Sequence, residues 1–355
     1  MTYAEILIGW YTVNKRDLPW RRTTNPYFIW LSEIILQQTK VDQGLPYYNA
    51  FIAKYPTVFE LADATETEVL KLWQGLGYYS RARNLHATAK HIVNNLDGVF
   101  PNNYKALLQL KGVGDYTASA IASICFNEVC AVVDGNVYRA LSRYYGIHTP
   151  INTTIGSKEF KALAQKLIAT KDPAIFNQAI MEFGAKQCKP KNPNCTICPL
   201  QNKCIAFKDA LIEELPVKIK SNAPKKKYFN FLVYIYKDKK ILLEKRKTKG
   251  IWQNLYQFPL IESDSILNKE ALQLLLKNNN TATNNLLSLA LYNTKPIIHK
   301  LSHQHLYTKF WIVQVNAINA KAIPILQLKD YPVPVLISNF LNEFNFKKEH
   351  LREFD

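Results

Sequence analysis

Apolar positions recur with a helical period in the first half of the chain, up to about residue 205, and short glycine-bearing turns separate the periodic segments. The clearest helical patterns cover residues 25–41, 66–73, 81–95, 116–125 and 135–144. Because no alternating strand pattern intervenes, the sequence predicts an all-α N-terminal half.

The second half has a different pattern. Two runs rich in β-forming residues, 228–236 and 241–244, are separated by a Lys/Asp turn, and a helical EALQLLLK precedes another such run, KFWIVQV. This order predicts a small α+β domain over 228–346. The stretch PVKIKSNAPKKK, at 216–227, has two prolines and five lysines and predicts an exposed linker. We therefore expect domains at 1–215 and 228–346, followed by a tail at 347–355.

Charge and composition narrow the class of protein. The chain has 355 residues, with 45 Lys+Arg against 28 Asp+Glu and a formal net charge of +17. A hydrophobic content of 48% is ordinary for a globular protein and argues against general disorder. The first residues lack a signal-peptide pattern, and no apolar run is long enough for a membrane span. We expect a cytoplasmic protein with a polyanionic partner, although a generically basic protein remains an alternative.

Four of the six cysteines form a tight cluster with the spacing C-x6-C-x2-C-x5-C: Cys188, Cys195, Cys198 and Cys204. In a cytosolic protein such a cluster indicates a metal site rather than disulfides. The compact spacing favours an iron–sulfur cluster over zinc, which more often uses two separated C-x2-C pairs. Either metal site could serve only to staple a loop.

Two isolated acids are candidates for catalysis. Glu33 lies in the apolar helical pattern FIWLSEIILQQTKV, where desolvation would raise its pKa and make it a general acid. Asp134 follows an apolar run and begins a helical pattern, so it could stabilise positive charge on a substrate. The alternatives are an exposed glutamate and an aspartate that merely caps its helix.

Other patterns are typical of nucleic-acid binding. Gly112 and Gly114 form a tight turn before a helix, whose backbone N–H groups suit a phosphate, although glycines also serve turn geometry alone. Aromatic and basic residues interleave at 18–22 and 75–83. There, arginines could hold phosphates while a ring or leucine wedges between bases.

These motifs together resemble a known family. WLSEIILQQTKV, WQGLGYYSRARNLH, LKGVGDYTASAI, VVDGNVYRAL, FNQAIMEFGAKQC and the four-cysteine loop occur in the order found in adenine DNA glycosylases of the MutY type. That family belongs to the helix-hairpin-helix superfamily, as does endonuclease III. The resemblance implies a multidomain fold, with an N-terminal all-α helix-hairpin-helix glycosylase domain that includes the iron–sulfur loop, and a C-terminal α+β Nudix-like domain.

The resemblance also implies an activity. A monofunctional glycosylase of this type flips adenine out of double-stranded DNA, where it is mispaired with 8-oxoguanine or guanine, and hydrolyses the N-glycosidic bond in base excision repair. Glu33 matches the acid that protonates adenine at N7. Asp134 matches the residue that stabilises the cationic sugar or adds to it covalently. Tyr116 occupies the slot that holds lysine in the bifunctional relatives, so no Schiff base is expected, and we expect its hydroxyl to bond near Asp134.

The remaining site assignments follow from position in the family's motifs. Arg21, Leu36 and Gln178 match residues around the extruded adenine, and Asn136 matches one near the sugar. Gln38, Thr39 and Tyr78 match residues around the oxidised guanine, with Tyr78 as a wedge. The four cysteines match the ligands of one 4Fe-4S cluster. The resemblance further implies a monomer associated with the bacterial nucleoid.

The C-terminal half resembles the family's Nudix-like domain most clearly at GIWQNLYQFP. The glutamate-rich helix that holds Mg²⁺ in Nudix hydrolases is absent after Gly250, so the domain is expected to read a base rather than hydrolyse nucleotides. Its reading loop is Leu301, Ser302 and His303, where relatives have Phe-Ser-His. The replacement of phenylalanine by Leu301 puts any stacking role in doubt.

Three alternatives remain open from sequence. An endonuclease III-like glycosylase/lyase on oxidised pyrimidines is disfavoured by Tyr116, Glu33 and the long C-terminal domain. A non-catalytic DNA-binding protein is disfavoured by the presence of both carboxyls. A nucleotide pyrophosphatase in the second half is disfavoured by the missing Mg²⁺ helix.

Overall fold

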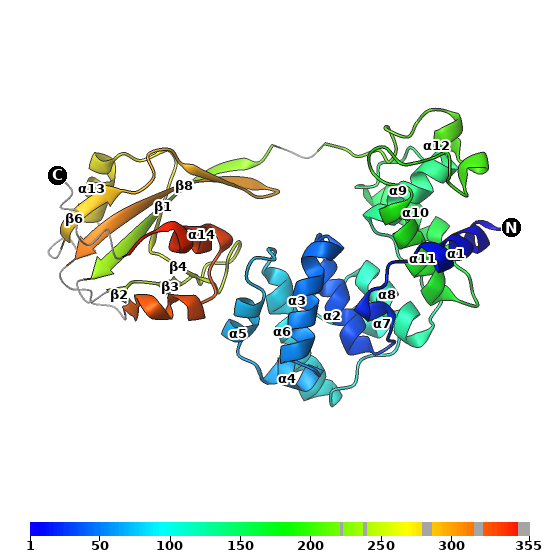
Figure 1. The fold of residues 1–355 in the computed structure, drawn as a ribbon, viewed down its shortest axis with the longest axis horizontal. Helices are drawn as coiled ribbons and strands as arrows, with labels where there is room; N and C mark the ends of the chain where they lie inside the picture. Colours follow the sequence, from blue (N-terminus) through cyan, green and yellow to red (C-terminus); the bar gives the residue numbers. More distant parts are fainter. Residues whose placement is uncertain (221–222, 237–239, 279–285, 316–321, 347–355) are drawn as a thin grey trace. The chain divides into compact units, whose positions relative to one another are not determined.

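The structure, a computed structural model, describes residues 1–220, 223–236, 240–278, 286–315 and 322–346. The chain divides into two compact units, each with its own internal contacts (Figure 1). Unit 1 comprises Met1–Ala64 and Asn84–Ser221, and unit 2 comprises Thr65–Arg83 and Asn222–Asp355. The division passes through one helix, α6, whose first turn belongs to unit 2.

Within its described residues, unit 1 contains helices and no strand, as the sequence predicts. Its elements are α1 (Tyr3–Asn14), η1 (Pro19–Arg21), α2 (Pro26–Leu36), α3 (Val41–Lys54), α4 (Val58–Asp63), most of α6 (Ser80–Leu96), α7 (Tyr104–Leu107), α8 (Asp115–Phe126), α9 (Gly135–Tyr145), α10 (Thr154–Leu167), α11 (Pro173–Lys186), η2 (Gln201–Lys203) and α12 (Ile205–Lys208).

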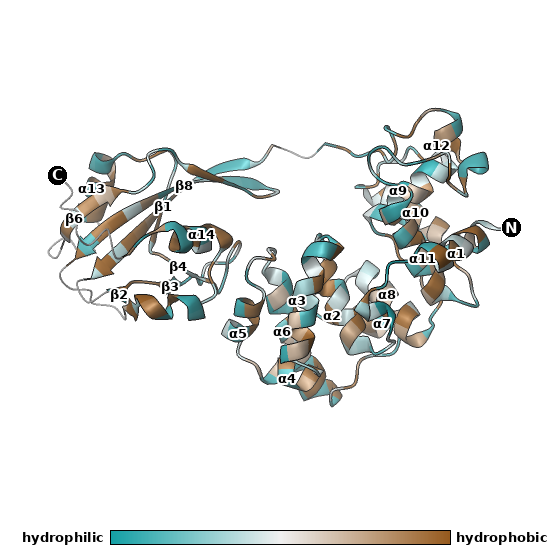
Figure 2. Ribbon diagram, in the orientation of Figure 1, coloured by the Kyte–Doolittle hydropathy of each residue, from teal (hydrophilic) through white to brown (hydrophobic). Residues whose placement is uncertain are grey.

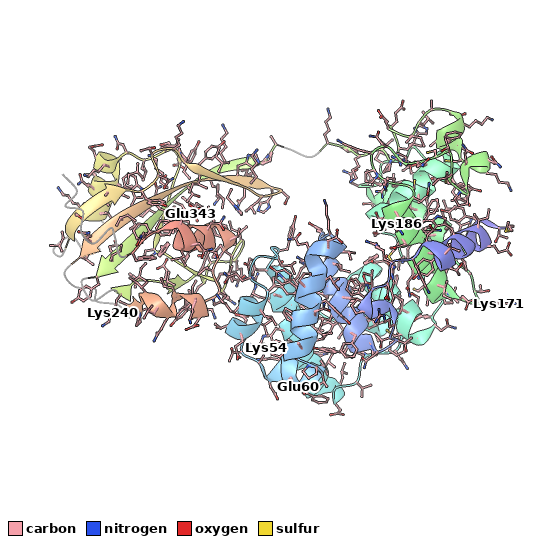
Figure 3. All side chains as sticks on the ribbon, in the orientation of Figure 1. Lys54, Glu60, Lys171, Lys186, Lys240 and Glu343 are labelled. Carbon is pink, nitrogen blue, oxygen red and sulfur yellow. The ribbon has the colours of Figure 1, made fainter. Side chains whose placement is uncertain are left out.

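The helix α11 lies at the centre of unit 1. It packs against α1, α8 and α9, and a shared hydrophobic core includes Leu7, Val137, Phe160 and Ile180. At its last turn, Lys186 donates from Nζ to the carbonyl of Asn14 at the end of α1, 2.6 Å away (Figure 3). The helix α2 packs in turn on α8 and α3, so α2, α8, α9 and α11 are held as one assembly.

The predicted helix at 25–41 is wrong in its extent. Asn25 caps α2 through a hydrogen bond to the N–H of Tyr27, but α2 ends at Leu36 and α3 begins at Val41. Between them Gln38 has a φ of +54°, a left-handed conformation that a continuous helix cannot contain. The apolar pattern FIWLSEIILQQTKV runs through this break, so it does not mark where α2 ends.

Unit 2 is a mixed sheet with helices on both faces. Strand β1 pairs in parallel with β8 over 12 residue pairs, in the sheet order β6-β8-β1-β2-β9, with β5 on β1 and β7 on β8. The elements are α5 (Glu66–Leu72), β1 (Lys225–Tyr236), β2 (Lys240–Ile241), β3 (Glu244–Lys245), β4 (Tyr256–Gln257), β5 (Leu260–Ser263), α13 (Lys269–Asn278), β6 (Leu286–Leu291), β7 (Ile297–Lys300), β8 (Gln304–Val315), β9 (Ile323–Pro324), η4 (Ile325–Asp330) and α14 (Val335–Glu343).

The two faces of the sheet are buried differently. On one face, Leu272 and Leu276 of α13 pack over Trp311 and Val313. On the other, Phe340 of α14 stacks on Phe310, with ring centroids 4.3 Å apart. Figure 2 shows the middle of β1 and β8 in brown, as expected for strands covered on both faces. The α+β prediction is confirmed.

Strand β1 begins at Lys225, three residues earlier than the strand pattern predicts, because Lys225–Lys227 pair in register with Gln304–Leu306 of β8. The predicted domain limits at 1–215, 216–227 and 228–346 remain predictions, and the tail at 347–355 lies outside the described residues. Among the described residues, no helix is both long enough and apolar enough to cross a membrane.

Candidate functional site

Glu33 is buried in the middle of α2, with only 8% of its surface exposed. Burial raises the pKa of its carboxyl to about 7, and the negative charge of Asp134 adds to the rise. A hydrogen bond with Tyr116 and the charge of Arg21 act in the opposite direction. The glutamate therefore carries a proton near neutral pH, as the apolar helix pattern predicts.

Asp134 is the N-cap of α9. Its Oδ1 accepts from the backbone N–H groups of Asn136 at 2.9 Å and Val137 at 2.8 Å. Its Oδ2 accepts from Asn136 Nδ2 at 2.8 Å. A helix start by itself lowers an aspartate's pKa, but here burial is the largest effect and raises the pKa of Asp134 against those donors. Asp134 thus caps a helix and also acts electrostatically on Glu33.

Tyr116 joins three helices at this site. It lies in the first turn of α8, its side chain hydrogen-bonds Glu33 of α2, and its hydroxyl lies 3.1 Å from Met181 Sδ on α11. Burial and the charges of Glu33 and Asp134 raise its pKa well above the usual value, so the phenol stays protonated. The hydrogen bond goes to Glu33, whereas the sequence predicts one near Asp134.

Arg21 and Gln178 are held by residues that sequence reasoning missed. Glu182 of α11, which is fully buried, accepts from Arg16 Nη2 at 2.6 Å and Arg21 Nη2 at 2.8 Å, and these bonds lower its pKa to about 2. Tyr11 of α1 donates to Gln178 Oε1 at 2.7 Å. The guanidinium of Arg21 lies 5.5 Å from the Tyr11 ring, so the two pairs are neighbours.

A hydrogen-bonded chain runs from Asp134 to the first cysteine of the cluster. Asn136 donates to Asp134, and Asn136 Oδ1 accepts from Arg139 Nη2 at 2.9 Å. The same Arg139 donates to the carbonyls of Gly184 at 2.6 Å and Cys188 at 2.7 Å. A change at the cysteine loop can therefore reach the carboxyl of Asp134 through two side chains.

Cys188, Cys195, Cys198 and Cys204 line one cavity beside α9. Arg143 crosses this loop: its Nη1 donates to the carbonyl of Lys189 at 2.7 Å and lies 3.6 Å from Cys188 Sγ. Burial raises the pKa of the Cys198 thiol to about 11, with the other cysteines adding to the rise. Such a set of half-buried thiols is a donor set for a cationic metal centre, which would stabilise the thiolates.

Among the described residues, no group of three or more His, Cys, Asp or Glu side chains is placed so that it could hold a metal ion. The four thiols share one cavity and supply sulfur donors, but they do not surround a single point as the ligands of a tetrahedral ion would.

In unit 2, a cavity of about 630 Å³ brings Tyr78 together with Leu301, Ser302 and His303, the residues predicted to form the reading loop. Trp252 and Arg83 also line it. The segment that carries Tyr78 is fixed to this unit by hydrogen bonds: Arg83 Nη1 donates to the Gln253 carbonyl at 2.9 Å, and Asn254 Nδ2 donates to Glu66 Oε1 at 2.8 Å.

Comparison with known proteins identifies the family. Residues 31–170 match the HhH-GPD superfamily of base excision DNA repair proteins, and residues 230–343 match the NUDIX domain. The adenine DNA glycosylase of Buchnera aphidicola subsp. Baizongia pistaciae is 38% identical over 328 residues, covering 90% of this chain and 88% of the relative. The chain belongs to the adenine DNA glycosylase family.

Solved structures support the fold of the glycosylase part. A thermostable thymine-DNA glycosylase has a TM-score of 0.55 and 30% identity, covering 58% of this chain and 95% of that chain. Endonuclease III in a non-covalent DNA complex has a TM-score of 0.51 and 21% identity, covering 59% of this chain and 94% of that chain. The predicted helix-hairpin-helix and Nudix-like folds are confirmed.

The other predicted site residues of this chain lie in two groups. Leu36 is the last residue of α2, and Gln38 and Thr39 lie just after it, where Gln38 is exposed. Gly112 and Gly114 are exposed in the turn before α8, and Gly112 has a φ of +81°. A Cβ at Gly112 would lie 2.8 Å from Asn84 Cβ, so this turn needs glycine for its geometry as well as for any phosphate contact.

The missed residues carry recognisable signals. Glu182 is an acid inside the apolar pattern FNQAIMEFGAKQC, the same signal that singled out Glu33. Arg139 and Arg143 are four residues apart, which places them on one side of α9, and both are buried. Buried arginines need several acceptors, and here backbone carbonyls of the cysteine loop supply them.

We predict that Gly184→Ala lowers stability and activity. A Cβ at Gly184 would lie 2.6 Å from the backbone oxygen of Asn136, so α9 must move and Asp134 with it. Overpacking of this kind costs about 1–3 kcal/mol. Gly9→Ala is the matched control, because Gly9 is an exposed helical glycine with nothing within 4 Å, and it should stabilise α1. Urea unfolding of both variants checks this, and equal effects would contradict it.

We also predict that Glu33→Gln changes how stability depends on pH. The folded pKa of Glu33, about 7, lies above the usual value of 4.5. Its stabilising contribution is therefore complete below pH 4.5 and is lost as pH rises through about 7. Between pH 5 and pH 8, the free energy of unfolding of Glu33→Gln should rise by roughly 2–3 kcal/mol relative to that of wild type, as measured by denaturant unfolding. Glu159→Gln, an exposed control on α10, should show no such gain. A stability difference between Glu33→Gln and wild type that does not change with pH would show that the pKa of Glu33 is not raised.

Proposed function

We propose that this chain is a monofunctional DNA glycosylase that removes adenine mispaired with 8-oxoguanine or guanine in double-stranded DNA. The observation that carries the proposal is a buried glutamic acid, Glu33, whose pKa is raised to about 7 by burial and by Asp134. Family membership and the net charge of +17 support DNA as the partner. We also propose that the protein is a monomer, located in the bacterial cytoplasm and associated with the nucleoid.

The two carboxyls divide the reaction between them. Adenine must leave the stacked duplex before any side chain can reach its glycosidic bond. Glu33 then gives its proton to N7, and the C1′–N9 bond breaks with its electron pair going to the base. Asp134 stabilises the cationic sugar until water adds to C1′, or adds to it covalently first. Asn136, bonded to Asp134 Oδ2, keeps that carboxylate near the sugar.

Tyr116 supports the assignment as a monofunctional enzyme. A lyase needs an amine that can form a Schiff base with the sugar. The phenol of Tyr116 cannot do this, and its raised pKa keeps it a neutral donor to the ionised form of Glu33. This residue also disfavours the endonuclease III-like alternative.

Around the base, Arg21, Leu36 and Gln178 are proposed to contact the extruded adenine. The buried Glu182 holds Arg21, and Tyr11 holds Gln178, so both side chains are fixed before substrate binds. A fixed site loses less entropy on binding than a mobile one. Gln38 and Thr39 are proposed to lie by the oxidised guanine, and the turn at Gly112 and Gly114 to bind a phosphate.

We further propose that the four cysteines hold one 4Fe-4S cluster. The shared cavity, their spacing and the donation from Arg143 toward Cys188 Sγ support it. When bound, the cluster supplies structural iron–thiolate bonds that fix the loop. Arg139 and Arg143 then connect that loop to α9.

The cavity of unit 2 is proposed to read the base opposite adenine. Ser302 and His303 are exposed hydrogen-bonding groups at its edge, and Tyr78 is the wedge beside the base. Leu301 lines the cavity where relatives have phenylalanine, so it supplies apolar contact without a ring.

The decisive test is single-turnover release of adenine from an A:8-oxoguanine duplex, revealed by alkali. Wild type should release adenine, and Glu33→Gln should lose roughly 10²–10⁴-fold in rate, because general-acid catalysis contributes that much. Above pH 7 the wild-type rate should fall about tenfold per unit as Glu33 ionises. Glu159→Gln should behave as wild type. Full activity of Glu33→Gln would show that another residue is the general acid. An inactive wild type would favour the alternative of a non-catalytic DNA-binding protein.

A second prediction concerns the reading loop. Ser302→Ala combined with His303→Ala should narrow the preference for 8-oxoguanine over guanine opposite adenine by roughly tenfold, as expected for the loss of one or two hydrogen bonds. Release from A:G should change little. The exposed Ser265→Ala is the control. An unchanged preference would show that this loop does not read the base.

A further inference from the structure

Three strands of unit 2 align polar and aromatic side chains on one face of the sheet. Lys226 of β1 is in register with His305 of β8, and His305 is in register with Lys300 of β7. Residues in register on neighbouring strands share a face. Two residues further along, Tyr228, Tyr307 and Ile298 form a second row on the same face.

This end of the face is not covered by the helix that buries the rest. Leu272 and Leu276 of α13 pack over Leu232, Trp311 and Val313, farther along the same strands. Lys226, Lys300 and Ile298 are exposed, whereas Tyr228, Tyr307 and His305 are half-buried. The rings of Tyr228 and Tyr307 lie 5.3 Å apart, so the second row forms a continuous aromatic surface.

The charge of this surface has one sign. Strands β1, β7 and β8 contain no acidic residue within their bounds. The nearest strand acid, Glu262 of β5, is in register with Phe229 and so points to the opposite face, where Lys227 and Arg246 bind it. Two ammonium groups, an imidazole and two phenol hydroxyls remain, and these groups are donors to phosphate oxygens in protein–DNA contacts.

We propose that Lys226, Lys300, His305, Tyr228 and Tyr307, called here the Lys226 platform, bind the phosphates of the DNA strand whose base the reading loop inspects. The inference rests on the proposed function. The platform adjoins the reading loop directly, because Lys300 precedes Leu301 and the backbone N–H of Lys225 donates to the His303 carbonyl at 3.1 Å. With strands about 4.8 Å apart, the row from Lys226 to Lys300 spans roughly 10 Å.

This placement gives the platform a role in positioning. Phosphate contacts fix the register of a protein on the duplex, while contacts to the base edge give specificity. The cavity lies on the other face of the sheet, where Trp252 packs on Phe229 and His299, so a strand held by the platform would pass the end of the sheet to present its base to Ser302 and His303. The first residues of β1, teal in Figure 2, are then the part of the predicted linker that meets DNA.

The test compares two double variants that remove equal charge. Lys226→Gln with Lys300→Gln removes two platform charges, and Lys269→Gln with Lys277→Gln removes two exposed charges from α13. Each is measured with the full-length protein on a duplex holding 8-oxoguanine opposite a non-hydrolysable adenine analogue, across a KCl series. The platform pair should reduce the slope of log Kd against log salt by about 1.8, since each phosphate contact contributes about 0.9. The α13 pair should leave the slope near wild type.

Hydroxyl-radical footprinting supplies the location. The platform pair should lose protection on the 8-oxoguanine strand beside the lesion, and Tyr228→Phe with Tyr307→Phe should weaken the same protection. Equal slopes for the two double variants would overturn the proposal, as would an unchanged footprint. Either result would indicate that the Lys226 platform binds an acidic protein surface instead of DNA. Failure of the proposed function is separate, because it appears as wild-type protein that binds DNA without releasing adenine.

Discussion

Three hydrogen-bond donors hold the carboxyl of Asp134 at the first turn of α9, and the arrangement of unit 1 around the site depends on that cap. The cap fixes where α9 begins, and α9 in turn carries Asn136, Arg139 and Arg143. Since these side chains bond to Asp134, to α11 and to the cysteine loop, the helix cannot shift without disturbing all three. The cap therefore does not compete with the proposed catalytic role, because one carboxyl can serve both.

The electrostatics of the site follow from how each acid is buried. Burial raises the pKa of Glu33 to about 7, because only a hydrogen bond with Tyr116 and the charge of Arg21 act against it. Glu182, also buried, receives two guanidinium groups, and its pKa falls to about 2. Near neutral pH one helical acid can hold a proton, and the other is an anion that orders Arg21. The difference lies in their partners, because both acids sit in apolar helices.

Sequence reasoning found what is encoded locally and missed what depends on packing. The helical periods, the cysteine spacing and the isolated acid Glu33 are visible in a few neighbouring residues. The break at Gln38 was hidden because α2 and α3 both continue the apolar pattern. Glu182, Gln178 and Arg139 each have a partner between 45 and 167 residues away along the chain, and only the fold brings these pairs together. Assignment of Thr65–Arg83 to the second unit was likewise not encoded locally.

Tyr78 combines a strained backbone with an exposed ring in this second unit. Its φ is +46°, a conformation that costs a bulky residue roughly 1–3 kcal/mol, and 49% of its surface remains exposed. Gly77, with a φ of +76°, allows the turn, and the guanidinium of Arg81 lies 5.5 Å from the Tyr78 ring. Neither the strain nor the exposure helps the fold. Both are explained if the ring is held outward for a partner, which is what a wedge between DNA bases requires.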